Sequence, residues 1–497
     1  MSDSTPAKTG FSRVFLIEGR ARPDHKPDYK SCHRLGGVSF GAGDITRIEC
    51  PDPDNYGGFI EKASYQGAQE RFTSELVGRY ASDMKSDLLR LAKARCASDI
   101  HVHFGACTNP SDFNKYTKAQ IWEDSSLGGF NTDPLGALES GEGAAVNETS
   151  PVSAKTMYEV TQLTFAERGG DAVTNPLVDV VICDNPSCGE CATESDGCKK
   201  IYALAASSPG SPGTGPDVVY SVDKGVNWAS AEITTLSSSQ TGSGIACMGD
   251  NVVVVSHDEG ALHYKDKDDL GTFGDWAEET TGFVVGGEPN DIWSVGDYAF
   301  VVGDGGYVYG TEDPSAGVVV LDAGVATTQN LSKVHAIDDE FAVAVGASNA
   351  VVYTENQTIW QAVTGPSVGV NLTAVWCKSK DEWWVGNASG DVFYTLDRGL
   401  TWTECTSLPG LAGYSDIDDI CFSTASVGYI SAVHTGPKGR ILRTIDGGYS
   451  WVVMPDQAGT MPDNDAITAI AGCRFDANFV VGVGDKDGSD GIIVVGQ

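Results

Sequence analysis

Four cysteines gathered in one short segment are the residues of this sequence best placed to do chemistry. They stand in CDNPSCGECATESDGC and are Cys183, Cys188, Cys191 and Cys198. The C-x-x-C pair lets two thiolates reach one ion, and four thiolates bind zinc tetrahedrally. A zinc ribbon has two such pairs set further apart, whereas this segment has one. Zinc, one or two disulfides formed after cell lysis, and free thiols in a surface loop all stay open, and each makes the segment a local staple between strands.

Two other groups of polar residues have the types that bind metals. His101 and His103 share one face of the predicted strand DIHVHFGAC, where an edge or interface position explains them better than a metal. The segment DKDGSDG offers calcium-like spacing through Asp485, Asp487, Ser489 and Asp490. Its glycine comes early and the bidentate glutamate of a calcium loop is missing. We therefore expect an acidic hairpin turn there and no metal.

The most regular pattern in the sequence is a strand followed by [ST]-x-D-x-G-x-x-W, which occurs intact three times. Its members are Ser221, Asp223, Gly225 and Trp228, then Thr395, Asp397, Gly399 and Trp402, then Thr444, Asp446, Gly448 and Trp451. Eroded copies end in Trp276 and Trp360, follow Gly306, and close the chain at GIIVVGQ. The hydroxyl and carboxylate can bond turn N–H groups, the glycine permits positive φ, and the tryptophan packs the next strand. These residues are therefore predicted to hold turns.

The strands before these turns recur at a regular interval. Their centres fall near 219, 262, 308, 352, 392, 441 and 493, a mean step of about 46 residues, which suits four-stranded propeller blades. Seven units fit, and the last ends after its third strand. We therefore predict a seven-bladed β-propeller over residues 176–497, closed by an upstream strand at 157–165, MYEVTQLTF.

This part of the sequence resembles the Asp-box propellers, also called BNR or sialidase-like, which include sialidases and a photosystem II assembly factor family. The resemblance implies the fold and little about function, because the repeated turns lie at the outside and unrelated activities share them. Trp383 and Trp384 could stack on a glycan, but core packing is the better interpretation.

A sialidase would need three arginines around the substrate carboxylate and a Tyr/Glu pair. The arginines beyond residue 175 are Arg398, Arg440, Arg443 and Arg474. The first lies inside a repeated turn and Arg443 immediately precedes one, so too few remain. We expect no enzyme, no catalytic residue and no cofactor, apart from zinc if the cysteines bind it.

Charge separates the two parts of the chain. The formal net charge is −35, and residues 1–175 carry 19 Lys and Arg against 24 Asp and Glu, so the rest is near −30. Such an acidic surface is solvated and does not grip nucleic acid. The polar N-terminus has only a four-residue apolar run, too short for a signal peptide or a membrane span, so we expect a cytosol-like compartment.

Residues 1–175 show no repeat. Strands are predicted at FSRVFLIEG, DITRIEC and FIEKASY, with the long turn PDPDNYGG between the last two, and one helix from Ser82 to about Ala97. This part of the sequence resembles the tail tube proteins of long-tailed bacteriophages. The resemblance lies in the order and spacing of four segments: DITRIECPDPDNYGGFIEKASY, SDLLRLAKARC, DIHVHFGAC and SAKTMYEVTQLTFAE. The chain as a whole is thus mostly β: an N-terminal tail-tube-like β-sandwich or barrel with one helix, then the propeller.

The tail-tube resemblance implies a virion structural protein. Its subunits self-assemble into stacked homohexameric rings around a lumen that genomic DNA crosses transiently, they contact other tail proteins, and they assemble in host cytoplasm. The propeller is then an outward-facing decoration domain. The alternative is a non-catalytic Asp-box propeller that scaffolds a protein complex or binds surface glycans.

Overall fold

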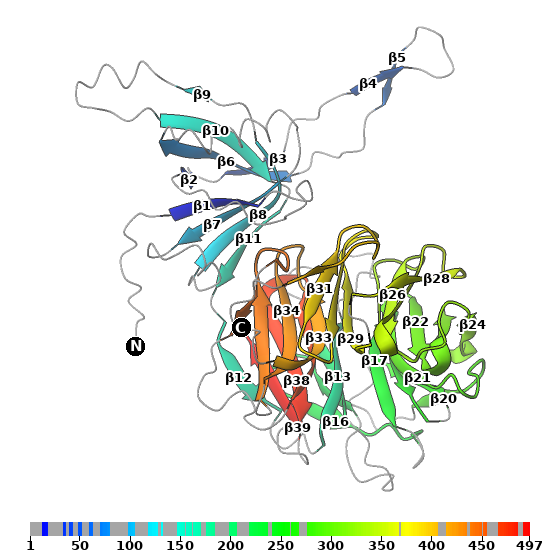
Figure 1. Cartoon of the computed structure of the whole chain (residues 1–497). Coiled ribbons are helices and arrows are strands. Elements are labelled where there is room, and N and C mark those ends of the chain that lie inside the picture. Colours follow the sequence, from blue (N-terminus) through cyan, green and yellow to red (C-terminus); the bar gives the residue numbers. More distant parts are fainter. Residues whose placement is uncertain are drawn as a thin grey trace, which may run out of the picture. The chain divides into compact units, whose positions relative to one another are not determined.

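The computed structural model divides into two compact units, residues 1–162 and 163–497 (Figure 1). Beyond the backbone of the strands, it describes residues 119–122, 157–161, 163–169, 175–183, 198–205, 218–236, 241–258, 260–267, 276–366, 369–405, 414–434, 439–449, 451–454, 466–485 and 491–497. The expected helix from Ser82 to about Ala97 lies outside the described residues, as do the side chains of His101 and His103. Within the described part, no helix is long and apolar enough to cross a membrane.

Unit 1 consists of antiparallel strands in its described part. They are β1 (Ser12–Ile17), β2 (His33–Leu35), β3 (Ser39–Ala42), β4 (Ile48–Pro51), β5 (Phe59–Lys62), β6 (Glu70–Arg79), β7 (Ser98–Phe104), β8 (Lys118–Leu127), β9 (Asn131–Thr132), β10 (Asn147–Ala154) and β11 (Thr156–Thr161). Nine of them join in one sheet around the path β1-β7-β8-β10-β6-β2, while β4 and β5 pair only with each other. This agrees with the mostly β class.

Unit 2 contains seven four-stranded antiparallel sheets, the blades of a propeller. Blades 1 to 3 are β13 (Leu177–Cys183), β14 (Lys200–Ala205), β15 (Val218–Ser221) and β16 (Ala229–Ala231); β17 (Gly242–Met248), β18 (Asn251–Ser256), β19 (Ala261–Asp266) and β20 (Ala277–Glu279); and β21 (Pro289–Val295), β22 (Tyr298–Gly303), β23 (Tyr307–Thr311) and β24 (Val319–Ala323). Short 3-10 turns stand at η3 (Asp304–Gly306), η4 (Pro314–Ala316) and, in blade 4, η5 (Ala347–Asn349).

The remaining blades follow the same order along the chain. Blades 4 to 6 are β25 (Leu331–Ala336), β26 (Ala342–Gly346), β27 (Ala350–Thr354) and β28 (Trp360–Thr364); β29 (Leu372–Cys377), β30 (Trp383–Asn387), β31 (Val392–Thr395) and β32 (Thr403–Glu404); and β33 (Tyr414–Phe422), β34 (Gly428–His434), β35 (Lys438–Thr444) and β36 (Val452–Val453). Blade 7 is β37 (Ile467–Cys473), β38 (Asp476–Asp485), β39 (Gly491–Gly496) and β12 (Phe165–Arg168). All seven predicted centres fall within the third strand of a blade, so the predicted seven-bladed propeller is confirmed.

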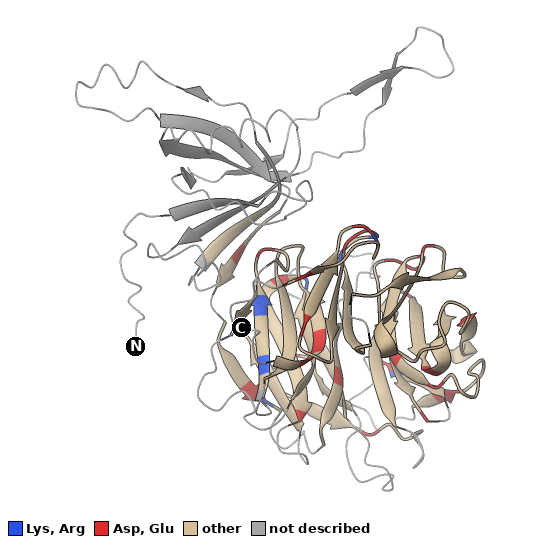
Figure 2. Cartoon of the chain, in the orientation of Figure 1, with Lys and Arg blue, Asp and Glu red and all other residues tan. Residues whose placement is uncertain are grey.

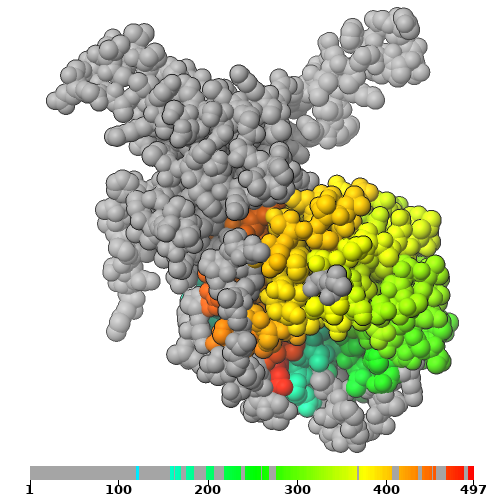
Figure 3. Space-filling model, viewed as in Figure 1, coloured from blue at the N-terminus to red at the C-terminus, as the bar shows by residue number. Residues whose placement is uncertain are grey.

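The core of unit 2 lies between adjacent blades. The second strands read as continuous apolar runs, such as VVVV in β18 and AVAV in β26, because a neighbouring blade covers each of their faces. Val253 and Val343 are fully buried in this way. Figure 3 shows consecutive blades packed side by side, from green through yellow to orange. Figure 2 shows more Asp and Glu than Lys and Arg along the described ribbon of these blades.

The ring closes through an upstream strand, but not the one predicted. The strand β12 pairs with β39, Phe165 opposite Gly496, and Thr164 and Gln497 exchange backbone hydrogen bonds of 3.0 and 3.2 Å. The predicted segment 157–165 is wrong apart from its end at Thr164 and Phe165, because β11 pairs with β8 of unit 1. The boundary between the units at residue 162 therefore gives β12 to the propeller, whereas the sequence analysis divided the chain after residue 175.

The closing ladder can be tested with two proline substitutions. Since Thr164 and Gln497 form a hydrogen-bonded pair, Ala166 opposite Val495 is the next such pair, and the N–H of Glu167 faces away from the ladder. We expect Ala166→Pro to lower the free energy of unfolding of the propeller by about 1–3 kcal/mol, because it removes a ladder donor from the closing strand. Glu167→Pro, on the solvent side of the same edge strand, is the control and should change calorimetric stability much less. Equal melting temperatures of the two variants would contradict this pairing of β12 with β39.

Candidate functional site

The residues of the three repeated turns lie between the third and fourth strands of blades 1, 5 and 6. Ser221, Thr395 and Thr444 each donate to the carboxylate two residues later, Asp223, Asp397 and Asp446, at 2.8–2.9 Å. Each hydroxyl also accepts the N–H of the glycine, and Gly225, Gly399 and Gly448 have φ of +76°, +76° and +97°. Trp228 and Trp402 are partly buried and Trp451 is fully buried. These turns hold hairpins and lie away from the channel described below.

Trp383 and Trp384 are both fully buried, so core packing is confirmed. They offer no platform for a glycan. The four arginines beyond residue 175 do not converge either. Arg398 pairs at the surface with Glu355 and Asp381, and Arg443 donates to the Ala477 carbonyl and Asn478. Arg440 donates to the adjacent carbonyl of Gly439, and Arg474 faces the central cavity.

The cysteine segment is not a local staple. Cys183 forms a disulfide with Cys247 of blade 2, and Cys198 forms one with Cys473 of blade 7. The Cα atoms are 5.6 Å apart in the first disulfide and 5.8 Å apart in the second, within the usual range for disulfides. The two outer cysteines are therefore unable to share a zinc ion with the inner pair, and no metal-binding cluster of His, Cys, Asp or Glu stands among the described residues. Cys188 and Cys191 lie outside that part of the chain, as do Asp487, Ser489 and Asp490 of the acidic turn.

Blade 1 is thus bonded covalently to both of its neighbours. Separations of 64 and 275 residues between the bonded cysteines explain why spacing within the segment gave no hint of the partners. The remaining cysteines with described side chains, Cys377, Cys405 and Cys421, are buried thiols, as expected for cysteines inside apolar strands.

The first strands of the blades contact one another in a closed ring and line a central channel. Each has a β-bulge or irregularity near its start, for example between Pro289 and Asp291 in β21. At this position five blades have a hydroxyl or amide that donates to a carbonyl of the next blade, at 2.5–2.9 Å. These bonds are Ser243 to Pro289, Asn290 to Leu331, Ser332 to Leu372, Thr373 to Ile417 and Thr468 to Leu177. The last one joins blade 7 to blade 1.

The residue after the bulge defines a ring around the channel, which we call the bulge ring. Its members, from blade 1 to blade 7, are Asp179, Gly244, Asp291, Lys333, Ala374, Asp419 and Ala469. The three aspartates accept backbone N–H groups of the next blade, from Ile245, Val334 and Ile470, at 2.9–3.0 Å. Because an innermost strand is an edge strand, these carboxylates satisfy donors that have no ladder partner.

One lysine stands among these three carboxylates. Lys333 Nζ lies 3.3 Å from Asp291 Oδ1. Burial disfavours its charged form, but Asp291, Asp179 and Asp419 outweigh burial and raise its pKa above the usual range. Burial, with Asp179 adding to it, raises the pKa of Asp291 to about 7 despite Lys333. Burial likewise raises the pKa of Asp419 to about 6.

Asp418 occupies the bulge position of blade 6, where five other blades have a donor. Burial, with Asp416 and Asp419 nearby, raises its pKa to about 8. Its Oδ2 is buried and makes no hydrogen bond within the described part of the chain. Its surroundings therefore favour the protonated form of this carboxyl.

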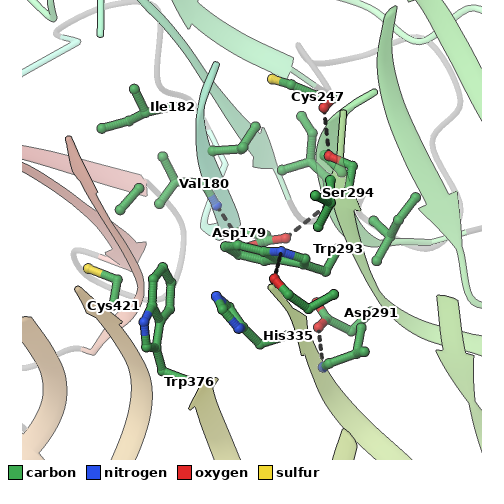
Figure 4. A pocket seen from close by; sticks show the side chains of 18 of the residues that line it. Asp179, Val180, Ile182, Cys247, Asp291, Trp293, Ser294, His335, Trp376 and Cys421 are labelled. Carbon is green, nitrogen blue, oxygen red and sulfur yellow. Dashed lines mark hydrogen bonds between the residues drawn. The ribbon is translucent and has the colours of Figure 1, made fainter. Parts of the chain in front are cut away.

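Further along the channel, one wall is aromatic. The ring centroid of His335 lies 4.3 Å from that of Trp293 and 3.9 Å from that of Trp376, and Figure 4 shows the three side chains together. Burial lowers the pKa of His335 to about 3, so it is neutral, and its Nδ1 accepts the N–H of Cys377 at 3.2 Å. The opposite wall has small side chains, Ala246 and Ala471, at the equivalent positions of blades 2 and 7.

Together these groups enclose a cavity of about 350 Å³. Between the bulge ring and the aromatic wall, every blade contributes a branched aliphatic side chain: Val180, Ile245, Ile292, Val334, Val375, Ile420 and Ile470. The other end of the cavity is formed by residues such as Gly296, Ile337 and Arg474. The channel is thus acidic at the start of the inner strands and apolar along its middle.

Comparison with known proteins found no family model and no curated protein that matches this chain. Among solved structures, YCF48 bound to a D1 peptide is 15% identical with a TM-score of 0.49, covering 68% of this chain and 97% of that one. YCF48 from Cyanidioschyzon merolae is 15% identical with a TM-score of 0.49, covering 67% of this chain and 98% of that one. The WD40 propeller domain of Doa1 is 13% identical with a TM-score of 0.45, covering 68% of this chain and 98% of that one. The propeller fold itself rests on the strand topology of this chain.

Apart from Cys183 and Arg474, none of the residues that line the channel was singled out from the sequence. A signal was present, because aligning the seven units places Asp, Lys, Gly or Ala and then Val or Ile at each inner strand, preceded by a small polar residue in every unit except the first, which has Val178. The tryptophans and aspartates in these positions read as ordinary strand and turn residues when each unit is taken alone.

The carboxyls of the channel predict an unusual pH dependence. Asp291 and Asp418 have folded-state pKa values above those of an unfolded chain, so their contribution to stability is complete at low pH and is lost as the pH rises through about 7 and 8. We expect the free energy of unfolding to fall by about 1–3 kcal/mol between about pH 7 and pH 8.5, where histidines no longer titrate. In chemical denaturation, Asp291→Asn and Asp418→Asn together should flatten this fall, and Glu340→Gln at the surface should not. A wild-type stability that rises over the same interval would contradict the assignment.

Proposed function

We propose that this chain is a non-catalytic propeller protein that binds an extended segment of another protein in the central channel. The observation that carries the proposal is the cavity of about 350 Å³ that all seven inner strands line. Aliphatic and aromatic side chains form most of its wall, and Asp179, Asp291, Lys333 and Asp419 converge at one end. A concave, mainly apolar site with a few converging polar groups is the usual form of a ligand site.

The arrangement of the polar groups favours binding over catalysis. Asp179 and Asp419 each accept two backbone N–H groups, one from their own strand and one from the next blade. His335 is buried, neutral and bonded to a backbone N–H. Groups held in this way are committed to the fold and poorly placed to transfer protons, so a scaffold that recognises a partner fits them better.

Peptide display on the purified full chain tests this function. We expect selection from a random peptide library to yield sequences that bind the wild-type chain with micromolar Kd. Ala471→Trp, which fills the cavity from blade 7, should weaken them about tenfold or more, since the space for a side chain is lost. The control is Ala362→Trp on the exposed outer strand β28, which should bind as the wild type does. Failure to select any binder would count against the proposal.

A tail-tube subunit is the second candidate function, and it rests on the sequence resemblance of residues 1–175. In unit 1, the strands β6 and β10 pair over eight residues, and β4 and β5 pair only with each other. In this case the chain is a virion structural protein that forms stacked homohexameric rings, with the propeller facing outward. Assembly in host cytoplasm is compatible with the two disulfides if they form once the particle meets an oxidising environment.

Electron microscopy of the purified full chain tests this second function. Striated tubes or stacked rings are expected, because the near-neutral balance of residues 1–175 permits close packing while the acidic remainder repels copies of itself. Compact monomers alone, at every protein concentration used, would remove the tail-tube candidate.

A further inference from the structure

We propose that the channel takes a lysine or arginine side chain from the bound segment, with its cationic head among the carboxylates of Asp179, Asp291 and Asp419. This inference rests on the proposed protein-binding function and specifies the chemistry of the partner. It follows from three features of the cavity: its charge balance, its proton content and the nature of its walls.

The bulge ring holds more negative than positive charge. Three aspartates and one lysine belong to it, and Lys333 interacts with all three of these carboxylates. Asp179 and Asp291 are 8% and 4% exposed, so water screens them poorly. Lys267 and Arg474 also line the cavity, and Lys267 pairs with Asp250 at 3.1 Å. Buried charges are stable only when they are paired, and within the bulge ring Lys333 is the one cation beside three carboxylates. A second cation entering the bulge ring would supply the missing positive charge.

At neutral pH a proton now supplies part of this missing charge. Asp291 has a pKa of about 7 and Asp419 one of about 6, both raised first by burial, with Asp179 adding to each. A carboxyl keeps its proton near neutral pH when the positive charge around it is too small to stabilise its ionised form. A guest ammonium or guanidinium would take the place of this proton, so binding should release protons to the solvent.

The walls fit the rest of a basic side chain. The aliphatic stem of lysine or arginine packs well on apolar surface while its charged head seeks polar partners, and the branched aliphatic side chains above the bulge ring provide such a surface. Trp293 and Trp376 are only half-buried and lie beside the cavity, where their faces can attract a cation. An anionic guest would instead meet uncompensated carboxylates, so the site discriminates by charge.

Calorimetric titration of the full chain with capped pentapeptides tests the inference. The central residue would be lysine, arginine, norleucine or glutamate, and the flanking positions would come from the sequences selected by display. We expect lysine or arginine to bind about tenfold or more tightly than norleucine, which has a similar length and no charge. Asp291→Asn and, separately, Asp419→Asn should reduce this preference severalfold, whereas Glu340→Gln on the surface should preserve it.

A second readout does not depend on any variant. Titration of the wild-type chain in buffers of different ionisation enthalpy should show proton release on binding a lysine peptide near pH 6.5, and almost none near pH 9. A purely structural role for the aspartates predicts no such release. This measurement stays informative even if both asparagine variants fail to fold.

The outcomes separate this inference from the function on which it rests. Selected peptides that bind with equal affinity whether the central residue is lysine or norleucine would overturn the inference and leave protein binding intact. Proton release caused by calcium or magnesium chloride alone, without any peptide, would replace the side chain with a metal ion. The absence of any selected peptide would instead overturn the proposed function itself.

Discussion

The propeller depends on how each blade satisfies the inner edge of its first strand. That strand has a ladder partner on one side only, so its remaining N–H and C=O groups would be left unpaired at the centre of the ring. A bulge solves the problem by turning one polar side chain toward the next blade, as in the bond from Thr468 to Leu177 across the closure. Aspartates at the following position accept the N–H groups. Each blade thus depends on the next one to satisfy the polar groups of its first strand.

This solution places charge inside the protein and thereby creates the candidate site. The aspartates that accept an N–H of the next blade add the buried carboxylates of Asp179 and Asp291 and the partly buried one of Asp419, and Lys333 offsets only part of their charge. The raised pKa values of Asp291 and Asp419 are the physical consequence. The small side chains of Ala246 and Ala471 line the cavity opposite the aromatic wall, where a guest side chain can enter. Structure and recognition therefore use the same residues.

Ring closure uses two kinds of bond at nearly the same place. The strand β12 pairs with β39 inside blade 7, and the disulfide from Cys198 to Cys473 joins blade 1 to blade 7. The disulfide from Cys183 to Cys247 continues this link into blade 2. A bond that spans 275 residues restricts the unfolded chain strongly in the chain-entropy view. The strand pairing within blade 7 and the disulfide between blades 1 and 7 together hold the ring closed.

The sequence by itself determined the propeller, its seven blades and the position of every third strand, because an apolar strand followed by an intact or eroded turn motif recurs about every 46 residues. It also determined that Trp383 and Trp384 belong to the core. Only the tertiary structure decided which strand closes the ring, which cysteines pair and which side chains meet in the channel. The closing segment was misjudged because alternation of Met157, Val160 and Phe165 says that a strand forms and not which edge it joins. Disulfide partners and the bulge ring depend on the angle between blades, which no local spacing encodes.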